Sequence, residues 1–294
     1  MPQGKIIKAL SGFYYVLTEE DQVIQCRGRG VFRKNKVTPL VGDEVVFQAD
    51  NELEGYILEV FERKNELVRP PIANVDQAIL VFSAVEPGFS TALLDRFLVL
   101  VEFNRIRPII CVTKMDLTTS DEKEEIHNYA KQYRQAGYEV LLTSSETETG
   151  VDQLIPMLEG EISVFAGQSG VGKSSLLNVL RPDLELKTDD ISSHLGRGKH
   201  TTRHVELIKV GNGLVADTPG FSSLEFTDIE AEDLNYCFPD IEQISENCKF
   251  RGCLHLKEPK CAVKEAVETG ELPQYRYEHF QQFLQEIKDR KPRY

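Results

Sequence analysis

A glycine-rich octapeptide constrains the fold of this chain more than any other stretch. It reads Gly167-Gln168-Ser169-Gly170-Val171-Gly172-Lys173-Ser174 and fits the pattern G-x-x-x-x-G-K-[ST] at every fixed position. An apolar run at 162–166 precedes it as an expected strand, and 174–180 follows as an expected helix. Glycines let successive backbone N–H groups turn toward a phosphate, and the helix start adds partial positive charge. We therefore predict a phosphate-binding loop in which Lys173 contacts the β- and γ-phosphates and the hydroxyl of Ser174 binds Mg²⁺.

Length and charge limit the classes of protein to which the chain can belong. Its 294 residues allow two or three domains. No apolar run is long enough to cross a membrane and residues 1–5 carry no secretion signal, so we expect a cytoplasmic protein without membrane contact. The net charge of −13 argues against general attraction to nucleic acid, but it leaves a local basic patch open.

Residues 1–70 have the pattern of a small closed barrel. Runs rich in β-branched and aromatic residues at 13–17, 23–26, 44–47 and 56–60 are separated by glycines, which favours an OB-fold. One stretch is basic without an acid, and it includes a phenylalanine. It could contact phosphates and stack a base, or it could be only a solvated hairpin face. Its members are Arg27, Arg29, Phe32, Arg33, Lys34 and Lys36.

Residues 71–224 alternate apolar strands with amphipathic helices. Strands are expected at 77–82, 108–112 and 139–142, and helices from the capping residue Ser90 onward and near 121–136. This alternation predicts an α/β fold with a mainly parallel sheet. Ligand-binding groups in such sheets lie at the carboxyl ends of the strands.

The tetrapeptide Thr113-Lys114-Met115-Asp116 follows one of these strands and resembles the guanine-reading motif Asn-Lys-x-Asp of GTPases. The carboxylate of Asp116 can accept hydrogen bonds from guanine N1–H and the 2-amino group. Adenine offers neither donor, and an unmatched buried acceptor costs about 1–3 kcal/mol or more. Lys114 can lay its stem over the base. Thr113 stands where asparagine is usual, and we expect this change to weaken the base contact.

Two further motifs fit the same nucleotide. Ser144 belongs to a short loop, 143–145, that resembles the one whose backbone N–H contacts guanine O6, although such residues equally cap helices. Asp217-Thr218-Pro219-Gly220 matches D-x-x-G. In that motif Asp217 would hold Mg²⁺ through water, and the N–H of Gly220 would contact the γ-phosphate.

The polar stretch 182–203 resembles the switch segments of GTPases, with an ordinary flexible loop as the alternative. Thr201 or Thr202 would complete the Mg²⁺ coordination shell. Phe221 stands where GTPases often have the glutamine that orients the attacking water, so we predict slow intrinsic hydrolysis. His200 is a candidate substitute, and an exposed loop histidine is the alternative.

The order of these motifs is unusual, because the guanine motif at 113–116 precedes the phosphate loop at 167–174. In most GTPases the phosphate loop comes first and the guanine motif last. The domain is therefore predicted to be circularly permuted, which joins the D-x-x-G motif directly to residues 225–294.

The C-terminal part carries a metal-binding pattern. Cys248, Cys253, His255 and Cys261 supply three thiolates and an imidazole within 14 residues, a closed tetrahedral set suited to structural zinc. The rest, 262–294, has a helical pattern interrupted near 270–273. Its basic end, 288–294, could contact RNA or could be a solvated tail.

Together these residues resemble the bacterial ribosome small subunit-dependent GTPase A family (RsgA, also called YjeQ or YloQ) over essentially the whole chain. The resemblance implies an OB-fold RNA-binding domain at 1–70, a permuted P-loop GTPase domain at 71–224 and a zinc-binding, mostly helical domain at 225–294. It extends the nucleotide contacts to Ser175, and we assign the hydrolytic step to Lys173, Gly220 and His200. It also implies that GTP and GDP are the ligands and that the partner is the 30S subunit with its 16S rRNA. We expect the protein to be a monomer. The function implied is late subunit maturation with stimulated GTP hydrolysis.

Two other functions remain open on the sequence alone. The chain could be an ATP-driven enzyme with an unrelated substrate, which competition between GTP and ATP would decide. It could also be a passive RNA-binding assembly module whose nucleotide site is structural. A Lys173→Ala variant that still supports subunit maturation would favour that second alternative.

Overall fold

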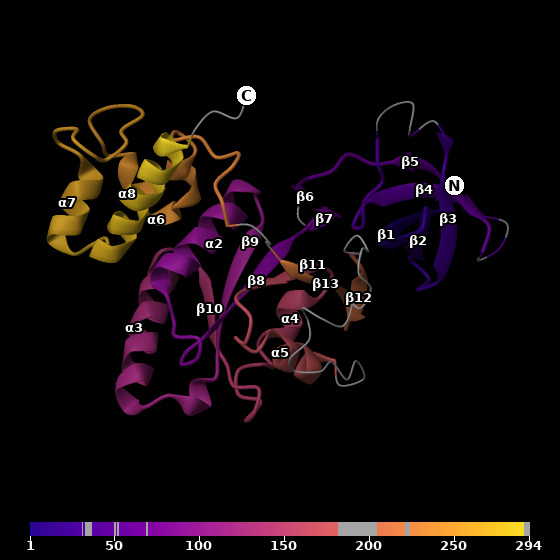
Figure 1. Cartoon of the computed structure of the whole chain (residues 1–294), viewed down its shortest axis with the longest axis horizontal. Coiled ribbons are helices and arrows are strands. Elements are labelled where there is room, and N and C mark those ends of the chain that lie inside the picture. The colour runs from indigo at the N-terminus through magenta and orange to yellow at the C-terminus, as the bar shows by residue number, and fades with distance from the viewer. Residues whose placement is uncertain are drawn as a thin grey trace.

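The computed structural model describes residues 1–30, 32, 37–49, 51, 53–68, 70–181, 205–220 and 224–290, without the side chains of 217–220. Three units follow one another along the chain (Figure 1): a β-barrel, a central sheet covered by helices and a C-terminal group of helices. No helix within these described ranges combines the length and the apolar character needed to cross a bilayer.

The N-terminal unit is a closed five-stranded barrel with the strand order β1-β2-β3-β5-β4. Alternate side chains fill its interior, and Ile6, Val16 and Ile57 are fully buried. The sequence pattern predicted four of the five strands but missed β1, because lysines and a glycine interrupt its apolar residues. The strands are β1 (Gln3–Leu10), β2 (Phe13–Thr18), β3 (Val23–Gly28), β4 (Glu44–Ala49) and β5 (Gly55–Val60).

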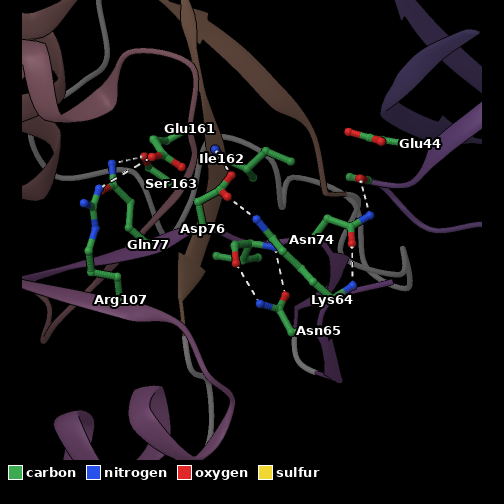
Figure 2. A network of polar contacts seen from close by, with 12 residues as sticks. Glu44, Lys64, Asn65, Asn74, Asp76, Gln77, Arg107, Glu161, Ile162 and Ser163 are labelled. Atoms are coloured by element: carbon green, nitrogen blue, oxygen red, sulfur yellow. Dashed lines mark hydrogen bonds and ion pairs between the residues drawn. The ribbon is translucent and has the colours of Figure 1, made fainter. Parts of the chain in front are cut away.

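A polar network joins the barrel to the sheet through the hairpin β6 (Glu66–Val68) and β7 (Pro71–Ala73). Figure 2 shows the carboxylate of Asp76 paired with Lys64 and accepting a hydrogen bond from the backbone N–H of Ile162 at 2.7 Å. The side chain of Asn65 both donates to and accepts from the backbone of Val75, at 2.7 and 2.9 Å. The linker is thereby held against the start of the strand that leads into the phosphate loop.

The central sheet has six strands in the order β10-β9-β8-β11-β13-β12. Its first five strands are parallel, and β12 pairs antiparallel with β13 at the edge. Gln77 is fully buried and donates to the hydroxyl of Ser163 at 2.9 Å, which ties β8 to β11 (Figure 2). The strands are β8 (Gln77–Ser83), β9 (Arg107–Thr113), β10 (Glu139–Leu142), β11 (Ile162–Ala166), β12 (Leu207–Val210) and β13 (Gly213–Gly220).

Helices cover both faces of this sheet, which confirms the predicted α/β layers. Leu80 of β8 packs with α2 and α3, whereas its neighbours Ile79 and Val81 pack with α4 and α5. Every residue of β8 is buried, as expected for a central parallel strand. Ser90 caps α2 as predicted, its hydroxyl accepting from the N–H of Leu93 at 3.3 Å. The helices are α2 (Thr91–Phe103), α3 (Ser120–Gln135), α4 (Ile155–Leu158) and α5 (Lys173–Leu180).

The C-terminal unit packs around Phe238, whose ring contacts those of Phe280 and Phe283. Val99 and Leu100 of α2 belong to the same apolar cluster, so this unit is anchored on the sheet domain through α2. The predicted interruption near 270–273 separates the last two helices. The elements are a 3₁₀ turn η3 (Leu234–Cys237), α6 (Pro239–Ser245), α7 (Ala262–Thr269) and α8 (Gln274–Asp289).

A buried ionic network connects α8 to α2. The guanidinium of Arg276 is almost fully buried and donates to the carboxylates of Asp95 and Asp240 at 2.5 and 2.8 Å. His279 Nδ1 lies 2.6 Å from the second oxygen of Asp95, and the hydroxyl of Tyr133 donates to the first at 2.8 Å. This network fixes how the C-terminal unit sits on the sheet domain.

We expect Arg276→Leu to lower the free energy of unfolding by about 3–5 kcal/mol, because it leaves the fully buried carboxylate of Asp95 and the largely buried one of Asp240 without the guanidinium. Urea unfolding of the full chain measures this loss. The control is Glu286→Gln, which removes an exposed ion pair with Arg96 and should cost less than about 1 kcal/mol. Equal losses of unfolding free energy in the two variants would show that the buried network stabilises the fold no more than an exposed ion pair does.

Candidate functional site

The phosphate loop lies between the end of β11 and the start of α5, as predicted. Gly167 has φ +145°, and a Cβ at this position would lie 2.1 Å from the carbonyl oxygen of Val81. Gly172 has φ +96° at the N-terminus of α5. Only glycine suits such backbone conformations and approaches, so these two positions follow from the loop's shape.

Lys173 closes this loop on itself. Its ammonium donates to the carbonyl oxygens of Gly167, at 2.8 Å, and of Gln168. Burial lowers the pKa of Lys173 to about 8. The Ser174 side chain is largely buried beside it at the start of α5. An incoming phosphate offers the ammonium a charged acceptor in place of two neutral carbonyls, which favours the exchange.

The T-K-x-D segment meets the phosphate loop directly. β9 and β11 flank β8, so their carboxyl ends lie at one edge of the sheet. The hydroxyl of Thr113 donates to the carbonyl oxygen of Val171 at 2.5 Å, and Lys114 Nζ donates to that of Gly170 at 2.7 Å. Asp116 lies two residues further on, in the turn η1 (Met115–Leu117), with its side chain exposed.

The hydroxyl of Thr113 is directed at the protein backbone, whereas we expected it to contact the base. The residue is buried, and its hydroxyl is also 3.2 Å from the carbonyl oxygen of Phe82, so it is directed at the protein backbone. It therefore supports the phosphate loop, and the idea that it contacts the base more weakly than asparagine finds no geometric basis. The motif pattern could not show this, because it records the residue type and not its partners.

The backbone N–H and the hydroxyl of Ser144 both form hydrogen bonds within the loop that follows β10. The N–H of Ser144 donates to the carbonyl oxygen of Thr149 at 3.0 Å, and its hydroxyl accepts from the N–H of Thr147 at 3.1 Å. The loop is tied to the T-K-x-D segment, since the N–H of Met115 donates to the carbonyl oxygen of Thr143 at 3.2 Å. Because the Ser144 N–H is engaged, half-buried Ser145 is the better candidate for a backbone donor to a base; it lies in the predicted loop 143–145, from which the sequence analysis singled out Ser144.

The D-x-x-G motif ends β13 next to the phosphate loop. β13 runs parallel to β11, and Gly220 pairs with Ala166, the residue just before the loop. The side chain of Asp217 is not described, and 182–204 and 221–223 lie outside the described residues. The expected roles of Asp217, of His200, Thr201 and Thr202, and of Phe221 therefore remain predictions.

The predicted metal ligands come together in the C-terminal unit. The ligand atoms of Cys248, Cys253, His255 and Cys261 all lie within 4.8 Å of one another. Cys248 Sγ and Cys261 Sγ are 3.9 Å apart, close to the roughly 3.8 Å edge of a tetrahedron with Zn–S bonds of about 2.3 Å. Three thiols and one imidazole are the donor set of a closed structural site, so the residues fit a zinc ion.

Neighbouring groups hold the histidine of this cluster in position. His255 Nδ1 lies 3.3 Å from Cys261 Sγ, and on the other side of the ring Nε2 donates to Asn235 Oδ1 at 3.0 Å. Burial lowers the pKa of His255, which favours the neutral imidazole that a metal requires. The carboxylate of Glu258 accepts from the N–H groups of Leu254 and Leu256 at 3.0 and 2.8 Å and shapes the loop. The sequence pattern did not indicate Asn235.

The remaining cysteines lie in apolar surroundings. Cys26 and Cys111 are fully buried, and burial raises the pKa of each thiol to about 11. Cys237 is also buried, outside the metal cluster, and its thiol donates to the carbonyl oxygen of Asp233. These three residues are packing residues.

Phe32, the aromatic residue of the basic stretch on the barrel, is buried, whereas a stacking role requires it at the surface. Phe32 lies in the core with 9% of its surface exposed, so it cannot stack on a base. The guanidinium of Arg27 lies 4.7 Å from the centre of the Phe13 ring, and Arg27 is paired across strands with Tyr56, which is 52% exposed. Arg33, Lys34 and Lys36 lie outside the described residues, as does 291–294 of the basic C-terminal end.

Comparison with known proteins gives consistent matches. The model of the RsgA GTPase family matches residues 60–227, and that of the RsgA N-terminal domain matches 3–57. The small ribosomal subunit biogenesis GTPases RsgA of Bacillus cereus and Bacillus subtilis are 71% and 70% identical, with all of both chains covered.

Solved structures give matches to the same family. The crystal structure of YloQ, a circularly permuted GTPase, is 65% identical with a TM-score of 0.88, and the match covers 100% of this chain and 97% of that one. YjeQ from Thermotoga maritima is 38% identical with the same TM-score, and 99% of each chain is covered. The predicted circular permutation is thereby confirmed.

We expect Thr113→Val to weaken GDP and inosine diphosphate equally, by about fivefold, because it removes one hydrogen bond to the phosphate loop, worth about 1 kcal/mol. Calorimetric titration of both nucleotides measures the two affinities. Thr113→Ser keeps the hydroxyl and should bind like the parent chain. A loss confined to GDP would instead mean that Thr113 contacts the 2-amino group of guanine, which inosine lacks.

We expect Asn235→Leu to lower zinc affinity by about 10- to 100-fold, because Nε2 of His255 loses the acceptor that orients the ring. Competition with a chromophoric chelator measures the affinity. Ser245→Ala, which removes the hydroxyl that contacts the Asn235 amide and leaves the His255 contact, is the matched control. Unchanged zinc affinity in Asn235→Leu would rule out this supporting role.

Proposed function

Because the chain belongs to the RsgA GTPase family, we propose that it acts on the small (30S) ribosomal subunit. There it assists a late step of maturation while hydrolysing GTP to GDP and phosphate. Its relatives in Bacillus are named small ribosomal subunit biogenesis GTPases, and this chain is about 70% identical to them along its whole length. The subunit stimulates the hydrolysis in this proposal. A cytoplasmic monomer that contacts 16S rRNA is the working form that we propose.

One observation supports the choice of nucleotide above the others. Hydrogen bonds from Thr113 and Lys114 to Val171 and Gly170 bring the T-K-x-D segment against the phosphate loop. A single nucleoside triphosphate can therefore reach both segments, with Asp116 free at the edge of the site to accept from guanine. An ATPase would leave that carboxylate without its donors.

We propose the following roles for the residues of the site. We assign the phosphates to the backbone of 167–172 and to Lys173, and Mg²⁺ to the hydroxyl of Ser174 with Asp217 and Thr201. A bound Mg²⁺ would neutralise charge that develops on the phosphates. Ser175 completes the loop, and Ser145 supplies the donor to guanine O6 in place of Ser144. Gly220 donates to the γ-phosphate, and His200 is the proposed group that positions the attacking water.

We propose that the two flanking units, the barrel and the C-terminal unit, contact the 30S subunit. The barrel carries an exposed pair of aromatic and basic side chains, Tyr56 and Arg27, of the kind that stacks bases and binds phosphates. The C-terminal unit is held in shape by the cysteine–histidine cluster, for which we propose one structural zinc ion. GTP hydrolysis then releases the protein from the subunit.

We expect purified 30S subunits to raise GTP turnover at least tenfold, because Phe221 supplies no group to orient water and the free protein should be slow. Phosphate release from GTP and from ATP, with and without subunits, measures this. Lys173→Ala should bind subunits without turnover. Equal turnover with and without subunits, or stimulation of ATP hydrolysis alone, would refute the proposal.

A further inference from the structure

A pocket of about 420 Å³ in the C-terminal unit has no part in the nucleotide site. It opens between η3, the end of α6 and the loop that joins the first two cysteines of the metal cluster. Cys248 and Cys253 form part of its wall, so the metal cluster holds the pocket in shape. The lining side chains that could bind a ligand include Glu232, Tyr236, Glu242, Glu246, Phe250 and Arg251.

Two aromatic side chains of this pocket face solvent. Tyr236 is 65% exposed and Phe250 is 44% exposed. The ammonium of Lys249 lies 5.3 Å from the centre of the Phe250 ring, so the face of this ring already accepts a cation. Exposed aromatics gathered at a pocket are typical of contact surfaces.

The wall of the pocket is acidic as well as aromatic. Glu232, Glu242 and Glu246 contribute carboxylates, and within the described part of the chain no ion pair neutralises them. Arg251 is the one basic side chain among the lining residues, so the carboxylates outnumber it. Burial raises the pKa of nearby Glu102 to about 7, and the charge of Glu242 adds to that rise.

We propose that this pocket binds an arginine side chain from an extended basic segment of a partner protein. A guanidinium can stack on Tyr236 or Phe250 while its N–H groups bond to the carboxylates of Glu242 and Glu246. RNA fits this wall poorly, because its phosphates meet three carboxylates. The inference goes beyond the proposed function, since neither the nucleotide site nor the metal cluster requires a protein contact here.

The test uses the full chain loaded with zinc and a fluorescein-labelled nonapeptide of alternating arginine and glycine. Fluorescence anisotropy in low salt gives the affinity. The same peptide with citrulline in place of arginine keeps the shape and removes the charge, and it should not bind. The double variant Glu242→Gln, Glu246→Gln should weaken the arginine peptide at least tenfold, and Tyr236→Ala at least threefold.

A matched control separates the pocket from the general acidity of the chain. Glu268→Gln, Glu271→Gln removes two exposed carboxylates from the same unit and should not change the affinity. Zinc content and melting temperature report on folding. Because Tyr236 is exposed, Tyr236→Lys should keep the fold and abolish binding even where the double variant is unstable.

Several outcomes would overturn the proposal. Binding of the citrulline peptide with equal affinity would remove the role of charge. Equal weakening in the control pair would reduce the effect to net charge. A failure to bind the arginine peptide at millimolar concentration would remove the site, and displacement of the peptide by a nonameric oligouridine would assign the surface to nucleic acid.

Discussion

The hydrogen bond between the hydroxyl of Thr113 and the carbonyl oxygen of Val171 joins two segments that lie 58 residues apart in the chain. It is possible only because β9, β8 and β11 are adjacent and parallel, so that their carboxyl ends open on one edge of the sheet. Permutation of the motif order does not disturb this geometry. A nucleotide site depends on which strand ends meet in space, and the same edge is formed whichever strand comes first.

Much of the fold could be predicted because its signals are local. The phosphate loop, the cap of α2 at Ser90 and the cysteine–histidine cluster each depend on residue types at short, fixed spacings. The layers of the sheet domain follow from alternating apolar runs, and buried β8 is the clearest of them. β1 was missed because its alternation is interrupted, and it is held by pairing with β2 and β4 on either side.

Contacts between distant segments could not be predicted in this way. Arg276 lies 181 residues from Asp95, and nothing local distinguishes it from the other charged residues of α8. Phe32 stands among basic residues and was expected at the surface, but the barrel buries it. Asn235 supports His255 from a turn 20 residues away. In each of these cases the tertiary partner, and not the neighbouring sequence, decides where the side chain points.

Helix α2 is the element through which these distant contacts are combined. Its N-terminus follows the loop in which the carbonyl oxygen of Glu86 accepts from Lys114, so this end is tied to the nucleotide site. Further along, Asp95 binds Arg276, and Val99 lies in the apolar cluster of the C-terminal unit. The barrel meets the sheet domain through the polar linker around Asp76, through the ion pairs of Lys8 with Glu206 and of Asp21 with Lys209, and through an apolar cluster that continues from the barrel interior into the sheet domain. Breaking a buried charge network costs more than breaking exposed pairs. The buried charge network therefore holds the C-terminal unit to the nucleotide domain more firmly than the ion pairs alone hold the barrel, which is attached mainly by apolar packing.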